Sequence, residues 1–222
     1  MIAHPNHGLR FPKPPNRKRA LRTQPNAAIR AIFSRRSVGK LIVPGPSEAE
    51  LITILRAGAA APDHKLTRPF WFVVFEGKSR EEFGTVLAEA LTSRLAEKGI
   101  EPTNGQVGKE QAKLMRAPLV IAVAAVRSEE ISLPDQEIIS AAAAAAQNML
   151  LAATSLGYGS IWRTGEAAYD PKVKAALGIK EADFIIGFLY FGSITEGLAP
   201  EPHDPDISAI ASSWEGGLTL SP

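Results

Sequence analysis

Residues 118–126 constrain the fold most strongly, because this stretch contains no polar side chain. A strand with one face in water alternates polar and apolar residues, whereas a strand covered on both faces reads as a continuous apolar run. Residues 69–76 and 184–192 are predicted to be two further buried strands, and long helical patterns separate the three. This order predicts an α/β or α+β layer structure in which helices cover a sheet.

Helices are predicted where apolar residues recur at helical spacing next to capping residues. Asn26 is the expected N-cap of the first helix, and Ser47 with Glu50 forms a capping box for the second. The central helix contains six consecutive alanines, which let neighbours approach closely, as in the buried spine of a domain or a subunit contact. The predicted helices span residues 25–36, 47–62, 79–98, 109–115, 135–156 and 170–178, with a loop over 99–108.

The amino-acid content excludes several kinds of site. The chain has 222 residues, enough for one domain with a buried core, and it contains no cysteine. A disulfide framework, a thiolate nucleophile and a cysteine-ligated metal are therefore excluded. His4, His7 and His203 lie in expected tails, so we expect no metal site.

No apolar run approaches the ~20 residues of a membrane span, and the lack of thiols suits a reducing compartment, so we expect a cytoplasmic protein.

The two ends of the chain differ from its middle in charge and proline content. Residues 1–24 carry six of the 25 Lys/Arg residues and none of the 23 Asp/Glu residues, so the remainder of the chain is net acidic. A basic end can bind nucleic acid or a membrane surface, but four prolines before residue 16 favour a disordered, basic, proline-rich tail without a nucleic-acid or membrane partner. Residues 199–222, with four prolines, are expected to be an extension that packs on the body or on a partner subunit.

Three polar clusters are candidates for a functional site. They comprise residues 35–37 (Arg-Arg-Ser), 61–65 (Ala-Pro-Asp-His-Lys) and 162–165 (Trp-Arg-Thr-Gly). Each has an ordinary explanation when taken alone: cations at a helix end, a solvated loop, and an aromatic–arginine pair at a strand end. No nucleophile elbow, dinucleotide fingerprint or Walker loop is present in its proper context. Arginine prefers phosphate because its planar fork donates parallel hydrogen bonds. Together the clusters suggest one anionic, planar, redox-active ligand.

The order of these motifs resembles the nitroreductase family, within about residues 26–195. Five motifs carry the resemblance, and they are those of its short subgroup. They are Arg35-Arg36-Ser37, the run from Arg56-Ala57-Gly58 to Ala61-Pro62-Asp63-His64-Lys65, Pro69-Phe70-Trp71-Phe72, Trp162-Arg163-Thr164-Gly165, and Gly187-Phe188-Leu189-Tyr190.

The resemblance implies an α+β, three-layer fold with a central, mostly antiparallel sheet flanked by helices. It also implies an intertwined homodimer with FMN at the subunit interface, and residues 25–198 as the FMN-binding domain. Arg35 and Ser37 match the motif that binds the FMN phosphate and ribityl chain, and His64 matches a histidine that contacts flavin across the interface. The further cofactor-binding residues implied are Arg36, Trp162, Arg163 and Thr164, and, as weaker candidates, Lys40, Ala60, Lys65 and Gly165.

One position departs from the subgroup pattern. Relatives can carry an arginine where this chain has Ala60, and the C-terminal basic residues that serve the phosphate in the wider family are also missing, because that end is acidic and proline-rich. The resemblance therefore implies that Arg163, or residues of the partner subunit, compensate for the lost guanidinium.

The activity that the resemblance implies is FMN-dependent oxidation of NADH or NADPH, with transfer of the electrons to small acceptors such as nitroaromatics or quinones. The mechanism would be ping-pong, with hydride transfer at flavin N5 and no catalytic protein residue, because the cofactor carries the redox chemistry. Two alternatives remain open: a flavin-dependent dehydrogenase or oxygenase that does not use nicotinamide, and a flavin-binding protein that is not an enzyme. The acceptor, the preference between NADH and NADPH, and the role of the basic tail are left open by the sequence.

Overall fold

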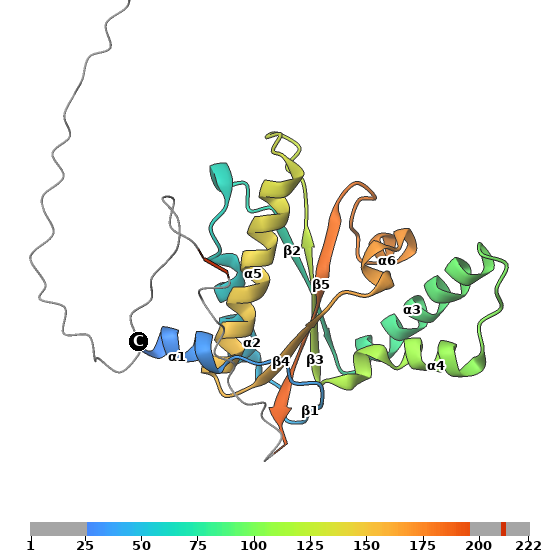
Figure 1. Cartoon of the computed structure of the whole chain (residues 1–222), viewed down its shortest axis with the longest axis horizontal. Coiled ribbons are helices and arrows are strands. Elements are labelled where there is room, and N and C mark those ends of the chain that lie inside the picture. The colour runs from blue at the N-terminus through green and yellow to red at the C-terminus, as the bar shows by residue number, and fades with distance from the viewer. Residues whose placement is uncertain (1–25, 196–209, 212–222) are drawn as a thin grey trace, which may run out of the picture.

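The computed structural model describes residues 26–195 and 210–211. Its strands form a central sheet that lies between two layers of helices (Figure 1). The sheet has five strands: β1, β5, β3 and β2 follow one another in that order, and β4 pairs with residues 188–192 of β5. Every strand pair in this sheet is antiparallel. The strands are β1 (Leu41–Ile42), β2 (Phe70–Glu76), β3 (Leu119–Ala125), β4 (Gly159–Arg163) and β5 (Phe184–Ile194).

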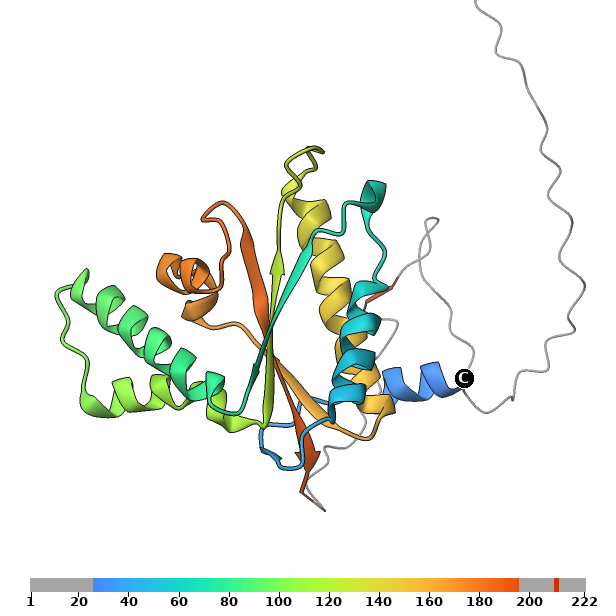
Figure 2. The same cartoon turned by 180° about the vertical axis from the view of Figure 1, so that it is seen from behind.

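The helices lie on opposite sides of the sheet, as the views from front and back show (Figures 1 and 2). One layer contains α1 (Ala27–Ser34), α2 (Glu48–Ala59) and α5 (Asp135–Ser155). The other contains α3 (Ser79–Ala96), α4 (Asn104–Gln111) and α6 (Pro171–Ala176). Three short 3₁₀ turns complete the order: η1 (His64–Leu66), η2 (Lys113–Arg116) and η3 (Glu166–Tyr169). The expected three-layer α+β fold with a mostly antiparallel sheet is confirmed.

Strand β3 is buried along its whole length, as its apolar sequence predicts. Ile121 and Val123 pack with Met149 in the core on the α2–α5 side, whereas Val120 and Ala122 belong to the core on the α3–α6 side. Each fully buried Val or Ile side chain contributes about 1.5–3 kcal/mol relative to an exposed one. The strand therefore joins the two cores into one body.

Helix α5 packs closely against its neighbours because its inward residues are small. Ala142, Ala145 and Ala146 have no exposed surface, and α2 crosses α5 at Gly58, where a Cβ atom would lie 2.7 Å from Met149 Cε. Among the described residues, α5 is the one helix that is long and apolar enough to span a membrane. Its contacts with α1, α2 and the sheet identify it as a core helix of the domain.

The region before β3 differs from the sequence prediction. Helix α4 begins at Asn104, within the expected loop over 99–108, and the expected helix over 109–115 is its end followed by η2. A capping box causes the early start: Thr103 Oγ1 accepts from the Gln106 N–H at 3.3 Å, and the Thr103 N–H donates to Gln106 Oε1 at 2.9 Å. Two glycines in this helix, Gly105 and Gly108, weakened the helical signal in the sequence.

Other predicted elements agree with the structure within a few residues, although the two-residue strand β1 was not predicted. The expected tail over 1–24 lies outside the described residues. So does the expected extension over 199–222, apart from residues 210 and 211.

The α3–α4 contact allows a test of packing with a matched control. A Cβ atom at Gly84 would lie 2.0 Å from the Gln111 backbone oxygen, whereas one at Gly108 would meet nothing within 4 Å. We expect Gly84→Ala to lower the free energy of unfolding by about 1–3 kcal/mol, because the two helices must separate. Gly108→Ala should raise it by up to about 1 kcal/mol, because alanine favours a helix. Urea unfolding at one protein concentration measures both, and equal stability of the two variants would contradict the described contact.

Candidate functional site

The first cluster lies where the chain leaves α1 and passes beside β4. The Arg35 N–H caps the helix by donating to Ala31 O at 2.9 Å, and both Arg35 and Arg36 are half-buried. Ser37 forms a parallel bridge with Ser160, and the Val38 N–H donates to Ser160 O at 2.9 Å. The backbone therefore attaches residues 35–37 to the start of β4.

The third cluster occupies the other end of β4. Trp162 belongs to the core on the α2–α5 side, and its Nε1–H donates to Ile186 O at 3.1 Å. Arg163, Thr164 and Gly165 are exposed. Arg163 is three residues beyond Ser160, roughly 10 Å along the strand. The structure thus brings residues 35–37 and 162–165 to one strand, and Lys40 is exposed just before β1.

A buried serine belongs to this strand, and a buried tyrosine lies beside it on β5. Tyr190, on β5 opposite Ile161, has 1% of its surface exposed. Burial raises the pKa of Tyr190 to about 12, although the nearby charges of Arg116 and Arg163 lower it. Its hydroxyl therefore keeps its proton well into the alkaline range. Ser160 is also 1% exposed, and its Oγ has no hydrogen-bond partner among the described residues.

The second cluster lies at the N-terminal end of α5. His64 opens η1, and its Nδ1 is 2.5 Å from Glu137 Oε2 in the first turn of α5. Asp63 Oδ2 accepts from the Arg68 N–H at 2.6 Å. Lys65, an exposed residue of this cluster, has a positive φ of 58°. Residues in that backbone region cost about 1–3 kcal/mol each and are concentrated at functional sites.

Helix α5 separates the second cluster from residues 35–37 within one chain. His64 contacts the first turn of the helix, whereas Ser37 pairs with Ser160, five residues beyond the last turn. A helix of this length spans roughly 30 Å. Figure 1 shows the same separation, with α1 beside one end of α5 and the β3–α5 loop at the other. Ala60 is the exposed C-cap of α2, near the second cluster in sequence.

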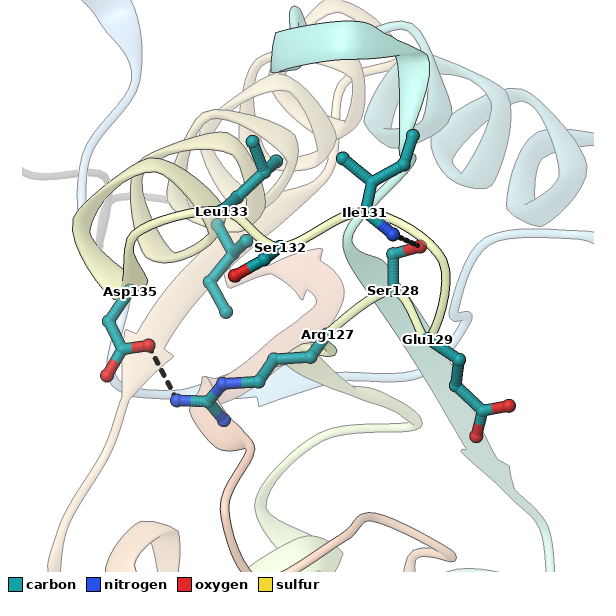
Figure 3. A pocket seen from close by; sticks show the side chains of 8 residues that line it. Arg127, Ser128, Glu129, Ile131, Ser132, Leu133 and Asp135 are labelled. Carbon is teal, nitrogen blue, oxygen red and sulfur yellow. Dashed lines mark hydrogen bonds and ion pairs between the residues drawn. The ribbon is translucent and has the colours of Figure 1, made fainter.

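A polar pocket of about 300 Å³ lies in the β3–α5 loop and is not part of these clusters (Figure 3). Arg127 there is 2.6 Å from Asp135 and 3.2 Å from Asp183, and the hydrogen bond that Arg127 donates to Asp135 raises the pKa of Arg127. Ser128 Oγ accepts from the Ile131 N–H at 3.2 Å. These groups satisfy one another, so they hold the loop in place. In the range 26–195, no group of three His, Asp or Glu side chains could hold a metal ion.

Two residues near the clusters, Glu137 and Ser160, were not predicted from the sequence to be functional. The contact between Gly187 and Trp162 was not predicted either. A Cβ atom at Gly187 would lie 2.3 Å from Trp162 Nε1, so only glycine admits the indole there. The Gly187 motif was visible in the sequence, but its partner was not. Glu137 and Ser160 had no sequence signal, because each lies far along the chain from its contact.

The family model described as Nitroreductase family matches residues 32–193. The chain belongs to the nitroreductase family. A relative from Escherichia coli (strain K12), "Putative NAD(P)H nitroreductase YdjA", is 39% identical over 167 residues, which cover 75% of this chain and 87% of the relative. "Putative NAD(P)H nitroreductase" of Haemophilus influenzae is 29% identical over 167 residues, 75% of this chain and 88% of that protein.

Solved structures of nitroreductases show the same fold. A nitroreductase-like family protein from Bacillus cereus has a TM-score of 0.71 at 23% identity, covering 88% of this chain and all of that one. A nitroreductase with bound FMN from Bacteroides fragilis has a TM-score of 0.62 at 25% identity, covering 85% of this chain and all of that one.

The contact between Gly187 and Trp162 can be tested in this nitroreductase-family chain. We expect Gly187→Ala to displace the indole, break its bond to Ile186 O, lower the melting temperature and shift the tryptophan emission. Gly105→Ala, whose Cβ would meet its nearest atom at 4.0 Å, is the control. In a Trp162→Phe background, which removes the Nε1 atom, the cost of Gly187→Ala should fall, because the two sites are coupled. Additive effects of the two substitutions would refute the contact.

Proposed function

We propose that the protein is an FMN-dependent oxidoreductase that uses NADH or NADPH to reduce small electron acceptors such as nitroaromatics or quinones. The observation that carries this proposal is the attachment of Arg35, Arg36 and Ser37 to the strand that bears Trp162 and Arg163. Family membership, the names of the two bacterial relatives and the FMN bound to the Bacteroides fragilis nitroreductase support it.

The chemistry of the donor groups fits FMN. Two consecutive arginines and a serine hydroxyl suit a phosphate and a hydroxylated chain, and we assign this part of the cofactor to residues 35–37. Trp162, Arg163 and Thr164 would lie beside the ring system, with Gly165 allowing close approach and Lys40 near the ring edge. Ser160 Oγ is a buried polar atom with no hydrogen-bond partner in the part of the chain that the structure describes, as expected beside a site that a ligand completes.

The protein's part in the reaction is binding and electrostatics. A bound FMN would accept hydride from the nicotinamide and pass the electrons to the second substrate, the two substrates occupying one place in turn. Arg163 supplies a positive charge that favours an anionic ligand. Because Tyr190 is buried and keeps its proton, it does not compete for that charge. We assign the phosphate to Arg35 and Arg36. Because Ala60 provides no guanidinium, Arg163 or residues of the partner subunit would supply the further positive charge.

A second copy of the chain is needed to complete the site. His64 and Lys65 lie roughly 30 Å from residues 35–37 within one chain, so we propose an intertwined homodimer in which His64 of each subunit faces the site of the other. The layer of α1, α2 and α5 exposes large apolar side chains suited to such a contact, and these are Ile29, Ile32, Phe33 and Ile52, with 39%, 46%, 63% and 42% of their surface exposed.

The remaining assignments follow from this proposal. Residues 25–198 would form the FMN-binding domain. We propose a cytoplasmic enzyme whose partners are its second subunit and small molecules, with no nucleic acid or membrane involved.

Flavin content and reduction test the activity. The purified protein should be yellow, acid should release FMN and not FAD, and NADH or NADPH should bleach the flavin absorbance in a stopped-flow experiment. A nitroaromatic or quinone added next should restore the colour. Bleaching by an organic substrate alone would favour a dehydrogenase, and flavin that no reductant bleaches would favour a binding protein. A colourless preparation that does not take up added FMN would refute the proposal.

Mixed dimers test the sharing of the site between subunits. Arg35→Ala and His64→Ala homodimers should each bind FMN more weakly, because every site lacks one group. A heterodimer with one variant in each subunit should bind one FMN at wild-type affinity, because both substitutions fall in the same site and leave the other intact. Two differently tagged chains allow its purification, and FMN titration counts the sites. If both sites of the heterodimer are impaired, each site is built within one chain.

A further inference from the structure

We infer that Glu137 is a positioning residue for His64, and that it fixes which ring nitrogen of the histidine is presented to the ligand. This inference rests on the proposed function, in which His64 faces the flavin of the other subunit. It concerns a residue that neither the sequence motifs nor the comparisons single out.

The contact itself is direct and long-range. His64 Nδ1 and Glu137 Oε2 are 2.5 Å apart, and the two residues are separated by 73 positions in the chain. Nδ1 must carry a hydrogen to bond a carboxylate oxygen, so the contact leaves Nε2 as the nitrogen that can bind a ligand. The hydrogen bond made by one imidazole nitrogen generally determines the role of the other.

Stability alone does not account for this pair. The side chains are 58% and 38% exposed, and exposed charge pairs contribute little, about 0–1 kcal/mol. An exposed histidine without a partner would rotate freely and interconvert its tautomers. The hydrogen bond to the carboxylate restricts both the rotation and the tautomer of the ring.

The two residues are held by elements of different kinds. Glu137 lies in the first turn of α5, where the helix dipole favours a carboxylate and the long helix keeps the backbone rigid. His64 begins a loop in which Lys65, Leu66 and Arg68 have φ values of 58°, 55° and 46°. A strained loop needs contacts that maintain it, and the Glu137 carboxylate supplies one from the rigid helix.

The space beside the pair suits a ligand group. A groove of about 360 Å³ runs between the loop and α5, with His64 and Glu137 on its walls. Ser140, Ala141 and Ala144 form the helical side of this groove. Because these side chains are small, they leave open space beside the imidazole of His64. Leu66 of the same loop has 82% of its surface exposed.

The experiment measures imidazole nitrogen shifts and FMN affinity in the full-length chain. The chain has four histidines, and comparison with His64→Ala assigns the His64 signals. In the wild type, Nδ1 of His64 should carry the hydrogen with and without FMN. Glu137→Ala should abolish that preference and weaken FMN binding by roughly tenfold, the equivalent of one hydrogen bond. Gln136→Ala, a substitution of an exposed neighbour in the same helical turn, should change neither quantity.

A double variant separates this inference from the proposed function. If Glu137 acts through His64, Glu137→Ala should have no further effect on FMN affinity in a His64→Ala background. Unchanged His64 shifts in Glu137→Ala, or an equal loss of affinity in both backgrounds, would overturn the inference while the wild type still binds FMN. A wild type that binds no FMN would overturn the proposed function and, with it, the positioning role toward flavin.

Discussion

Close packing around α5 is the constraint on which the rest of the structure depends. Its inward alanines let α2 and the sheet approach closely. Gly58 of α2 has no side chain to obstruct the crossing of α2 with α5. The same helix sets the distance between the functional clusters, because one contacts its first turn and another attaches just beyond its last. A single element thus produces both a tight core and a divided site.

The division of the site explains why a second subunit is part of the proposed function. A flavin mononucleotide is far shorter than α5, so no ligand of that size can touch His64 and Arg35 of one chain. The apolar side chains exposed on α1 and α2 provide a surface for the second copy. In the proposed dimer, packing within the chain and assembly between chains are connected through the length of one helix.

Local sequence accounted for much of the candidate site, because its clusters are short motifs at the ends of elements. The Ser47 capping box, the Asp170-Pro171 helix start and the buried strands were also readable from neighbouring residues. The start of α4 was missed because two glycines weakened a helical pattern that the Thr103–Gln106 capping box still begins. Backbone hydrogen bonds within a few residues outweighed the low helix propensity of glycine there.

The sequence by itself determined the class of fold, the family and the residue types of the candidate site. These depend on periodicity and on motifs a few residues long. Only the tertiary structure decided which residues meet: Glu137 with His64, Ser37 with Ser160, and Gly187 with Trp162. These contacts join positions 25 to 123 residues apart. They arise from the pairing of strands and the packing of α5, which no local pattern of side chains specifies.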